Sequence, residues 1–290
     1  KRKTGEIKVK KYESDIIVHK SKSNIEFIQF KKLLEYKEIE HAFFLRHGGK
    51  SKDIYSTLNF RVRGKDKAEN VYENLNKICN VLNLERKKVV KGLQAHTDRN
   101  ICIDINNYKE YIFEKNSEEE FDGMITNEKK IPLIITTADC TPIIFLDPVN
   151  KCIANVHSGW KGTVKQIYLK TCKLMNEKYN TNYKDIICCI GPCIRKCCWT
   201  TKDRDLIENQ ILSIWPNEKK YIQKVDEIYH VDFINCIKED LIKLGLKSEN
   251  ILDANICTCC NNEDFFSFRK TTMKEEKDYG TQASIVQINI

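Results

Sequence analysis

The sequence lacks any apolar run long enough to cross a membrane. A membrane-spanning helix needs about 18 to 20 apolar residues in succession, and no stretch of the 290 residues approaches that length. The first thirty residues also lack the apolar segment of a secretory signal peptide. We therefore expect no membrane partner, although the sequence does not begin with Met and its true start need not be present.

Signatures of nucleic-acid binding are also missing. The formal net charge is +8, and a basic balance can indicate a nucleic-acid partner. However, there is no zinc-finger spacing, no aromatic strand of the RNA-binding type and no dense basic block beyond Lys1-Arg2-Lys3. We expect no nucleic-acid partner, and we attribute the charge to a solvated N-terminal face and to weak attraction for anionic substrates.

The cysteines do not form the framework of a small secreted domain. Fourteen of them are scattered along the chain, often in adjacent pairs such as Cys188-Cys189 and Cys259-Cys260. Disulfide-rich secreted domains are much shorter. This pattern predicts reduced thiols in a cytoplasmic compartment.

Length and hydrophobic patterning predict one folded domain. The chain has no internal repeat or low-complexity tract, and aromatic residues occur throughout. We expect a single enzyme domain over residues 41–290, with the basic residues 1–40 packed as an extension. The oligomeric state is left open.

Helical periodicity is clearest in residues 66–83. Asp66 and Glu69 resemble a capping box, and the apolar residues that follow are three or four positions apart. The segment Val89–Leu93 then reads as a strand that ends close to His96. Acidic residues 118–120 and residues 271–278 are expected in exposed loops.

Three short apolar segments follow one another in the middle of the chain. Residues 132–137, 142–146 and 151–156 read as buried strands, and a helix with an apolar stripe from Val164 to Tyr179 follows. Later segments predict a strand at 185–190, a helix at 232–244 and a final strand at 284–290. Without regular alternation of strands and helices, these elements favour an α/β or α+β layer structure with mixed sheets.

Residues with metal-binding side chains stand where these strands end. His96, Cys140 and His157 form the kind of three-ligand set that holds a catalytic zinc while a fourth position stays open. The long sequence gaps between them make spacing a weak signal. Two other interpretations stay open: three unrelated structural residues, or a Cys/His hydrolase with Cys140 as nucleophile and Asp139 orienting an imidazole.

Six sequence blocks stand out along the chain, and His157-Ser158-Gly159-Trp160-Lys161-Gly162 is the most specific of them. The other blocks are Gln94-Ala95-His96, Asp122-Gly123-Met124-Ile125-Thr126, Thr137-Ala138-Asp139-Cys140, Ile190-Gly191-Pro192-Cys193-Ile194 and Phe265-Phe266-Ser267-Phe268-Arg269. In order and spacing these blocks resemble those of the YfiH-like, or laccase-domain, family, and the resemblance covers about residues 41–290.

The resemblance implies a four-layer α/β/β/α fold with one Zn²⁺ held by His96, Cys140 and His157. It further implies a zinc-dependent purine nucleoside phosphorylase, a transferase that splits adenosine, inosine, guanosine or methylthioadenosine with phosphate. Adenosine deaminase activity, a hydrolase reaction, is associated with the same family. Peptidoglycan-precursor editing is the alternative activity, and a catalytically silent binding protein is the alternative of another class.

The family's older label of multicopper polyphenol oxidase fits the sequence poorly. Several coppers need many His ligands, and the whole chain contains six His. The chain also departs from the family pattern at two places. Thr97 follows His96 where the family usually has Gly, and Trp199-Thr200 stands where a Tyr-Glu pair is usual, which puts the substrate preference in doubt.

Four further residues are candidates for substrate contacts. Arg46 matches an Arg-x-Gly-Gly turn of the family, and with Asn59 it is a candidate for phosphate or ribose binding. Lys161 lies in the first turn of the helix after His157, where helix N–H groups and a cation can hold an anion. Arg269 is a weaker candidate of the same kind, and all four are also compatible with ordinary surface roles.

The C-terminal half contains a rival set of metal ligands. Cys257 and Cys260 have CxxC spacing, and Cys193 together with Cys197 or Cys198 would complete a four-thiolate site. Buried, reduced thiols are the simpler interpretation, so the sequence leaves a second metal open.

Overall fold

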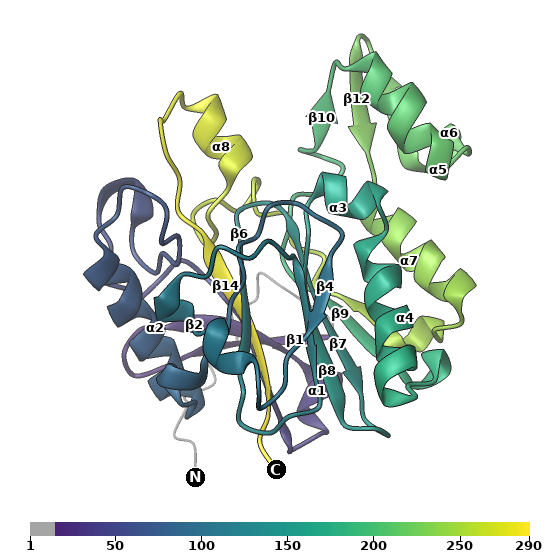
Figure 1. Cartoon of the computed structure of the whole chain (residues 1–290). Helices are drawn as coiled ribbons and strands as arrows, with labels where there is room; N and C mark the ends of the chain where they lie inside the picture. The colour runs from purple at the N-terminus through teal and green to yellow at the C-terminus, as the bar shows by residue number, and fades with distance from the viewer. Residues whose placement is uncertain (1–14) are drawn as a thin grey trace.

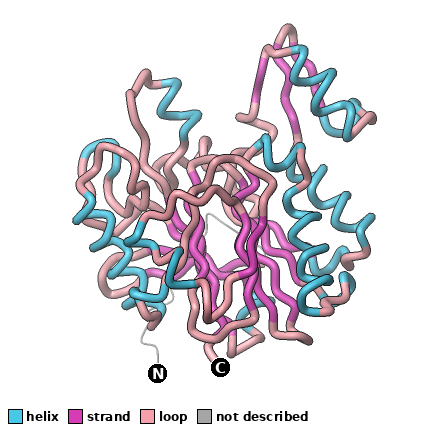
Figure 2. The backbone as a smooth tube through the Cα atoms, viewed as in Figure 1, coloured by secondary structure: helices cyan, strands magenta, loops and turns pink. Residues whose placement is uncertain are grey.

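The computed structural model describes residues 15–290, with residues 218 and 219 described in their backbone alone. Residues 1–14, which include the basic block at the N-terminus, lie outside the described residues. Two stacked sheets occupy the centre, with helices on either side (Figures 1 and 2). None of the described helices combines the length and apolar character needed to cross a membrane.

The first sheet has five strands in the order β1-β2-β3-β14-β6, and every neighbouring pair is antiparallel. β1 and β2 belong to the predicted N-terminal extension and complete one edge of this sheet. The predicted boundary at residues 40–41 falls inside β3. The strands are β1 (Ile16–Lys20), β2 (Glu26–Phe30), β3 (Ile39–Phe44), β14 (Gln282–Ile288) and β6 (Leu133–Thr137).

The second sheet is mixed and has six strands in the order β13-β9-β7-β8-β5-β4. Its outer pairs, β13 with β9 and β4 with β5, are parallel, and the inner pairs are antiparallel. The strands are β13 (Ile251–Asp253), β9 (Ile187–Ile190), β7 (Thr141–Asp147), β8 (Cys152–Ser158), β5 (Gly123–Thr126) and β4 (Asn100–Cys102).

Each sheet is covered on both faces, which explains the continuously apolar strands in the sequence. Two consecutive residues of β14 show this. Val286 packs between the two sheets, whereas Ile285 faces α2 (Ala68–Leu82). The outer face of the six-stranded sheet packs on α4 (Ile167–Tyr179) and α7 (Phe233–Leu244). The result is the predicted four-layer α/β/β/α fold.

A smaller unit stands at one end of the molecule, at the upper right of Figure 1. It contains the three-stranded sheet β10-β12-β11 and has its own apolar cluster around Trp215. Its elements are β10 (Thr200–Thr201), the π-helical segment Leu206–Ile211, α5 (Leu212–Ile214), α6 (Glu218–Tyr221), β11 (Ile222–Val225) and β12 (Ile228–Val231).

The remaining helices are short. The α-helical ones are α1 (Lys31–Leu34), α3 (Trp160–Val164) and α8 (Phe268–Met273). Single 3₁₀ turns occur at Asp53–Tyr55, Arg86–Lys88, Tyr108–Glu110, Phe113–Lys115, Tyr183–Asp185 and Ser248–Asn250.

Three local predictions differ from the structure. The capping box is absent, because Asp66 bonds to the Lys67 N–H and the Asn70 amide and no side chain caps α2. The helix after His157 is divided into α3 and α4 because Gln166 between them has a positive φ of 55°. The predicted loop 271–278 begins with the last turn of α8.

The segment before His96 was also predicted wrongly as a strand. Val90 and Leu93 make isolated bridges only. Val90 bonds to Pro132 and Ile134 on one side while Lys91 bonds to Tyr111 on the other, so the segment belongs to no continuous ladder.

A buried amide joins the two central sheets. Asn155 of β8 donates to the carbonyl oxygens of Leu133 (2.9 Å) and Ser284 (3.0 Å) in the other sheet. It also accepts a hydrogen bond from the Ser284 hydroxyl at 3.0 Å. Because every partner is buried, water cannot replace these bonds.

We predict that Asn155→Ala lowers the free energy of unfolding by about 3 kcal/mol, since it leaves buried polar groups without partners. Denaturant unfolding followed by circular dichroism measures the change. The exposed Asn209, which bonds only to Asp205 on the same helical segment, provides the control: Asn209→Ala should cost less than about 0.5 kcal/mol. Equal losses in both variants would contradict the inter-sheet role.

Candidate active site

Cys140 lies where the chain crosses from one sheet to the other. β6 ends at Thr137 in the five-stranded sheet, and β7 begins at Thr141 in the six-stranded sheet. The connection turns sharply at Asp139, whose φ is +86°. The thiol of Cys140 therefore emerges at the rim of the two sheets rather than within the core.

His157 lies near the end of β8, with its ring held by a buried carboxylate. His157 Nδ1 and Asp122 Oδ1 are 2.6 Å apart, and the two side chains are 4% and 0% exposed. Since Asp122 bonds to Nδ1, the Nε2 atom is left for the site.

His96 is placed by the same carboxylate through its backbone. Asp122 accepts hydrogen bonds from the N–H groups of His96 (3.1 Å) and Thr97 (2.6 Å) and from the Thr97 hydroxyl (2.7 Å). His96 has a φ of +60°, a conformation that costs energy and that these bonds support. A methyl group on Gly159 would lie 2.4 Å from the His96 ring, so glycine is required there.

The structure thus brings together the three predicted metal ligands. One donor atom from each of His96, Cys140 and His157 lies within 4.8 Å of the others. Cys140 Sγ is 3.6 Å from His96 Nε2, and the two imidazole rings are 4.9 Å apart between centroids. Three converging His and Cys donors with a carboxylate behind one imidazole fit a catalytic zinc site.

Electrostatics within this group favour the thiolate form of Cys140. Burial raises the pKa of a thiol, but the positive charge of His157 and hydrogen bonds from both histidines outweigh it and lower the pKa of Cys140 to about 6. Conversely, burial opposes protonation of His157, while the Cys140 thiolate and the bond to Asp122 raise its pKa to about 10.

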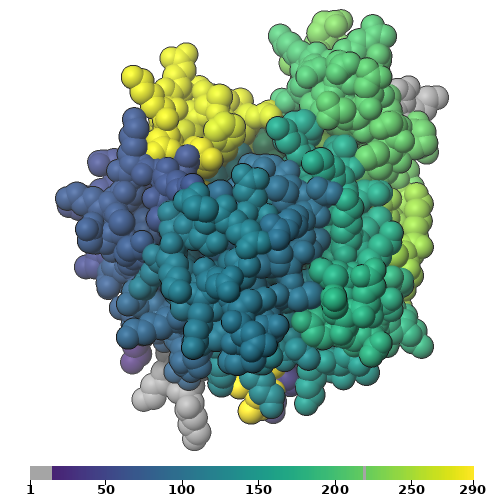
Figure 3. All heavy atoms as spheres, in the orientation of Figure 1, coloured from purple at the N-terminus to yellow at the C-terminus, as the bar shows by residue number. Residues whose placement is uncertain are grey.

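The three residues open into a cavity of about 620 Å³, a size typical of small-molecule sites. In Figure 3 the surface is hollowed between α8 (yellow) and the unit that contains β10 and β12 (green). Aromatic side chains contribute to its walls. They are Phe60, Trp160, Trp199, Phe233, Phe268 and Tyr279.

The lining of the cavity is strongly cationic. Its basic members, apart from the two histidines, are Arg61, Arg63, Lys91, Lys196 and Arg269. Among the described residues that line it, Asp139 is the sole acid. Burial raises the pKa of Asp139 despite the hydrogen bonds that it accepts from Thr258, Ser267 and Arg269 N.

Of the four predicted substrate contacts, Arg269 lines this cavity. Its guanidinium donates to the Cys198 carbonyl (2.7 Å) and to the Thr200 hydroxyl (2.8 Å). Arg269 is the second residue of α8 and does not end a strand. Trp199, at the family's Tyr-Glu position, also lines the cavity and contacts Phe233 edge to face.

The other three predicted contacts lie outside the lining. Arg46 borders a separate cavity of about 270 Å³, donates to the carbonyls of Ser56 and Asn262 and stacks on Phe266. Asn59 is fully buried and bonds to Asp66, Arg61 N and Thr281 N. Lys161 is exposed beside the ring of Trp160, in a helix of five residues.

Two residues of the candidate active site, Asp122 and Lys91, were not identified as site residues from the sequence. Asp122 was named only as part of a family block, and its position before a buried strand is its one sequence signal. Lys91 interrupts the apolar segment Val89–Leu93, and a lysine in such a segment is a usable signal. Asp139, expected to orient an imidazole, instead accepts hydrogen bonds from Thr258, Ser267 and Arg269 N.

Comparison with known proteins decides the family. Residues 40–289 match the family described as multi-copper polyphenol oxidoreductase laccase. The chain belongs to this family. The resemblance inferred from the six sequence blocks is therefore confirmed.

Several similar members of this laccase-like family have names. The chain is 31% identical over 235 residues to purine nucleoside phosphorylase YlmD of Bacillus subtilis, covering 81% of this chain and 84% of that protein. It is 27% identical over 251 residues to the purine nucleoside phosphorylase of Bacteroides thetaiotaomicron, covering 84% and 91%. The fold matches the crystal structure of the hypothetical protein YfiH of Bacillus licheniformis, with a TM-score of 0.82, 24% identity and coverage of 91% and 96%.

The remaining histidines of this laccase-like chain lie apart from the site. His19 of β1 stacks on Phe27, and His41 Nε2 accepts from the Phe30 N–H. His47 pairs with Asp264, and His230 bonds to the Lys196 carbonyl. Among the described side chains of residues 15–217 and 220–290, only two groups of at least three metal-ligating side chains occur, and one of them has no histidine. This distribution does not provide the many His ligands of a multicopper centre.

We predict that alkylation of Cys140 in metal-stripped protein reaches half its maximal rate near pH 6, because the thiolate is the reacting form and the pKa lies there. Mass spectrometry after brief iodoacetamide treatment measures each cysteine. Cys102, partly exposed with a pKa raised by burial, is the control and should react only at a pH well above that needed for Cys140. A midpoint for Cys140 near that of Cys102 would contradict the assignment.

Proposed function

We propose that this chain is a zinc-dependent purine nucleoside phosphorylase that uses inorganic phosphate to split nucleosides into free base and ribose 1-phosphate. The names of the Bacillus subtilis and Bacteroides thetaiotaomicron relatives support this proposal. So does the arrangement of a His/Cys/His group at the base of a cationic cavity with aromatic walls.

The charge of the cavity is the observation that carries the proposal. Phosphate is an anion, and five Lys or Arg side chains facing one buried, hydrogen-bonded Asp139 create a positive field for it. Of these cations, Arg269 is held rigidly by backbone carbonyls, and Lys91 projects from a buried segment. We assign phosphate binding to Lys91 and Arg269.

Aromatic side chains are suited to the base. Trp199 and Phe233 form one part of the wall, and Tyr279 lies under the guanidinium of Arg61 at 3.8 Å in another. Flat heteroaromatic rings stack on such surfaces with a gain of about 1 kcal/mol or more. The expected substrates are adenosine, inosine, guanosine and methylthioadenosine.

The site residues that would hold zinc are His96, Cys140 and His157. A zinc ion held by these three side chains would supply Lewis-acid chemistry to the reaction. Asp122 fixes the His157 ring so that Nε2 faces the site, and it stiffens the turn that carries His96. These hydrogen bonds of Asp122 exclude other orientations of the His157 ring and thereby preorganise the site.

Deamination of adenosine is the second candidate, because zinc also serves hydrolytic deaminases. Those enzymes use a glutamate near the metal as general acid and base. No glutamate is among the described residues that line the cavity. The described lining offers cations that suit phosphate and no glutamate for proton transfer, so it favours phosphorolysis over deamination.

We predict that adenosine yields free adenine only when inorganic phosphate is present, with ribose 1-phosphate formed in equal amount. Chromatography of reactions with and without phosphate measures both products, and Cys140→Ala and His157→Ala should remove the activity. Inosine formed equally in both conditions would show deamination instead. No conversion of any purine nucleoside, with cleavage of a muropeptide precursor, would favour peptidoglycan editing; no turnover of either would indicate a silent binding protein.

We predict that phosphate binding weakens as the pH rises from 7 to 9 in a manner set by Lys91. Burial and the nearby Arg63 lower the pKa of Lys91 to about 8, so its ammonium group is charged below this pH and neutral above it. The apparent KM for phosphate should rise about tenfold in the parent, as loss of one charge-assisted contact of roughly 1.5 kcal/mol implies. Steady-state kinetics at fixed nucleoside measures it.

Variants separate the cavity cations from those inferred from sequence alone. Lys91→Arg stays charged at pH 9, so its KM for phosphate should not rise over this range. Lys161→Ala and Arg46→Ala test the sequence-based assignment, because neither residue lines the cavity. A larger KM increase in these two than in Lys91→Ala would return phosphate binding to them.

A further inference from the structure

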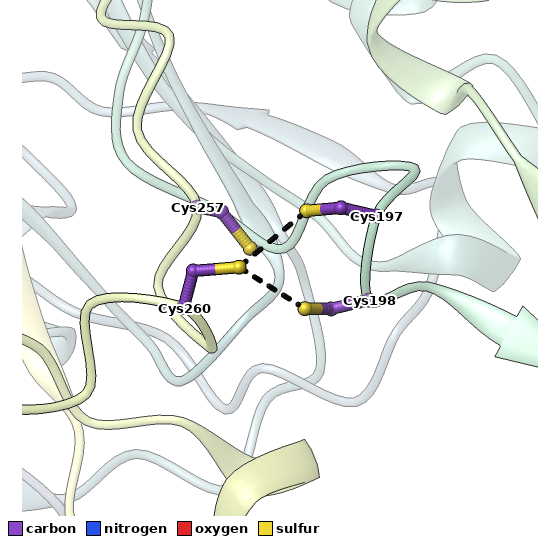
Figure 4. Close-up of side chains that lie close together, drawn as sticks. All are labelled: Cys197, Cys198, Cys257 and Cys260. Atoms are coloured by element: carbon purple, nitrogen blue, oxygen red, sulfur yellow. Dashed lines mark hydrogen bonds between the residues drawn. The ribbon is translucent and has the colours of Figure 1, made fainter.

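Four cysteine sulfurs converge at a second place, away from the His/Cys/His group. Cys197 and Cys198 stand in the turn before β10, and Cys257 and Cys260 belong to the segment after β13. Figure 4 shows the two pairs pointing toward one another across a gap between these segments. The 58 residues 199–256 separate the pairs in the sequence, so the tertiary fold alone brings them together.

The distances suit one tetrahedral ion. All four Sγ atoms lie within 4.8 Å of one another, and Cys260 Sγ is 3.4 Å from Cys198 Sγ and 3.6 Å from Cys197 Sγ. Zinc bonds thiolates at about 2.3 Å, which places tetrahedral ligands roughly 3.8 Å apart. All four cysteines are free, since a disulfide would require about 2.05 Å.

Backbone groups are already arranged for negative charge on sulfur. The sulfur of Cys257 accepts hydrogen bonds from the backbone N–H groups of Cys260 and Arg195. Donation from N–H groups stabilises the thiolate, which is the form that binds metal.

The two segments are held in register independently of any ion. Cys193 N donates to the Ile256 carbonyl at 3.2 Å, and Thr258 N donates to the Cys193 carbonyl at 3.1 Å. Arg195 pairs with Asp253 through two bonds of 2.8 and 2.7 Å. Cys197 and Cys260 are exposed, whereas Cys257 is buried, so an ion can enter from solvent and be anchored below.

We propose that Cys197, Cys198, Cys257 and Cys260 bind a second zinc ion with a structural role. Four protein thiolates close the coordination shell, so no position is left for a substrate. The sequence had suggested Cys193 as a member, but in the structure Cys193 lies outside the four and both Cys197 and Cys198 belong to them. Thiolates are soft ligands, whereas calcium and magnesium bind oxygen ligands, so neither of these two ions fits the site.

The proposed ion would stabilise one wall of the cavity. The carbonyl of Cys198 and both oxygens of Thr200 accept hydrogen bonds from Arg269. Trp199 and Thr200 line the cavity. A link between Cys197-Cys198 and the 257–260 segment therefore fixes the strip of chain against which Arg269 rests.

Zinc analysis of variants tests the proposal independently of activity. In Cys140→Ser/His157→Ala protein, which lacks two of the three donors of the other site, we expect one zinc per chain after purification under reducing conditions. Adding Cys257→Ser and Cys260→Ser should remove it. Cys259→Ser, a neighbouring buried thiol outside the four, is the matched control and should retain one zinc.

If the variants with Cys257→Ser and Cys260→Ser fail to fold, two further measurements test the proposal without these substitutions. Titrating the Cys140→Ser/His157→Ala protein with an organomercurial should release its zinc as four thiols react, and cobalt in its place should show the charge-transfer bands of a four-thiolate site. The thermal midpoint should fall by at least about 5 °C when the zinc is removed. Zinc absent from this protein, or a disulfide among the four cysteines in protein kept reduced, would overturn the proposal.

Discussion

One buried carboxylate, that of Asp122, connects the two histidines of the candidate active site. It accepts hydrogen bonds from the His157 ring and from the backbone of His96 and Thr97. Without these bonds the positive φ of His96 would have no compensation, and the His157 ring would be free to present either nitrogen. The distances among the three donors therefore depend on a residue that is not itself one of them.

Layering explains why the site lies where it does. Because both sheets are buried on both faces, polar side chains that must reach a substrate can gather only at the rim, where strands end or the chain changes sheet. Cys140 lies at such a crossing between β6 and β7, and His157 is the last residue but one of β8. Asn155, two residues earlier on β8, bonds to β6 and β14 and keeps the sheets in a fixed relation next to the site.

The cavity and the four-cysteine group share a wall. Within residues 196–201, Cys197 and Cys198 belong to the thiol group and the other four residues line the cavity. Arg269 bonds to this segment from α8. In the proposed enzyme, zinc would thus have two unlike tasks in one chain: three donors with an open position at the chemistry, and four thiolates closing a structural link. The Trp199-Thr200 departure from the family pattern occurs directly beside Cys198, in this same wall.

Local pattern was enough for most elements and for the three central donors. Strands β6, β7 and β8 were predicted from their apolar runs, and the stripe of α2 from its period, because burial on a regular element imposes a regular spacing. His96, Cys140 and His157 were predicted as ligands because residue type limits which side chains bind zinc and because the motif blocks preserved their order. The structure brings their donor atoms within 4.8 Å of one another. What the sequence could not determine depends on long-range pairing: that β6 joins a different sheet from β7 and β8, that Lys91 rather than Arg46 faces the cavity, and that Cys198 rather than Cys193 completes the thiol group. Separation along the chain carries no information on such contacts, since they are decided by which faces of distant strands and loops bury one another.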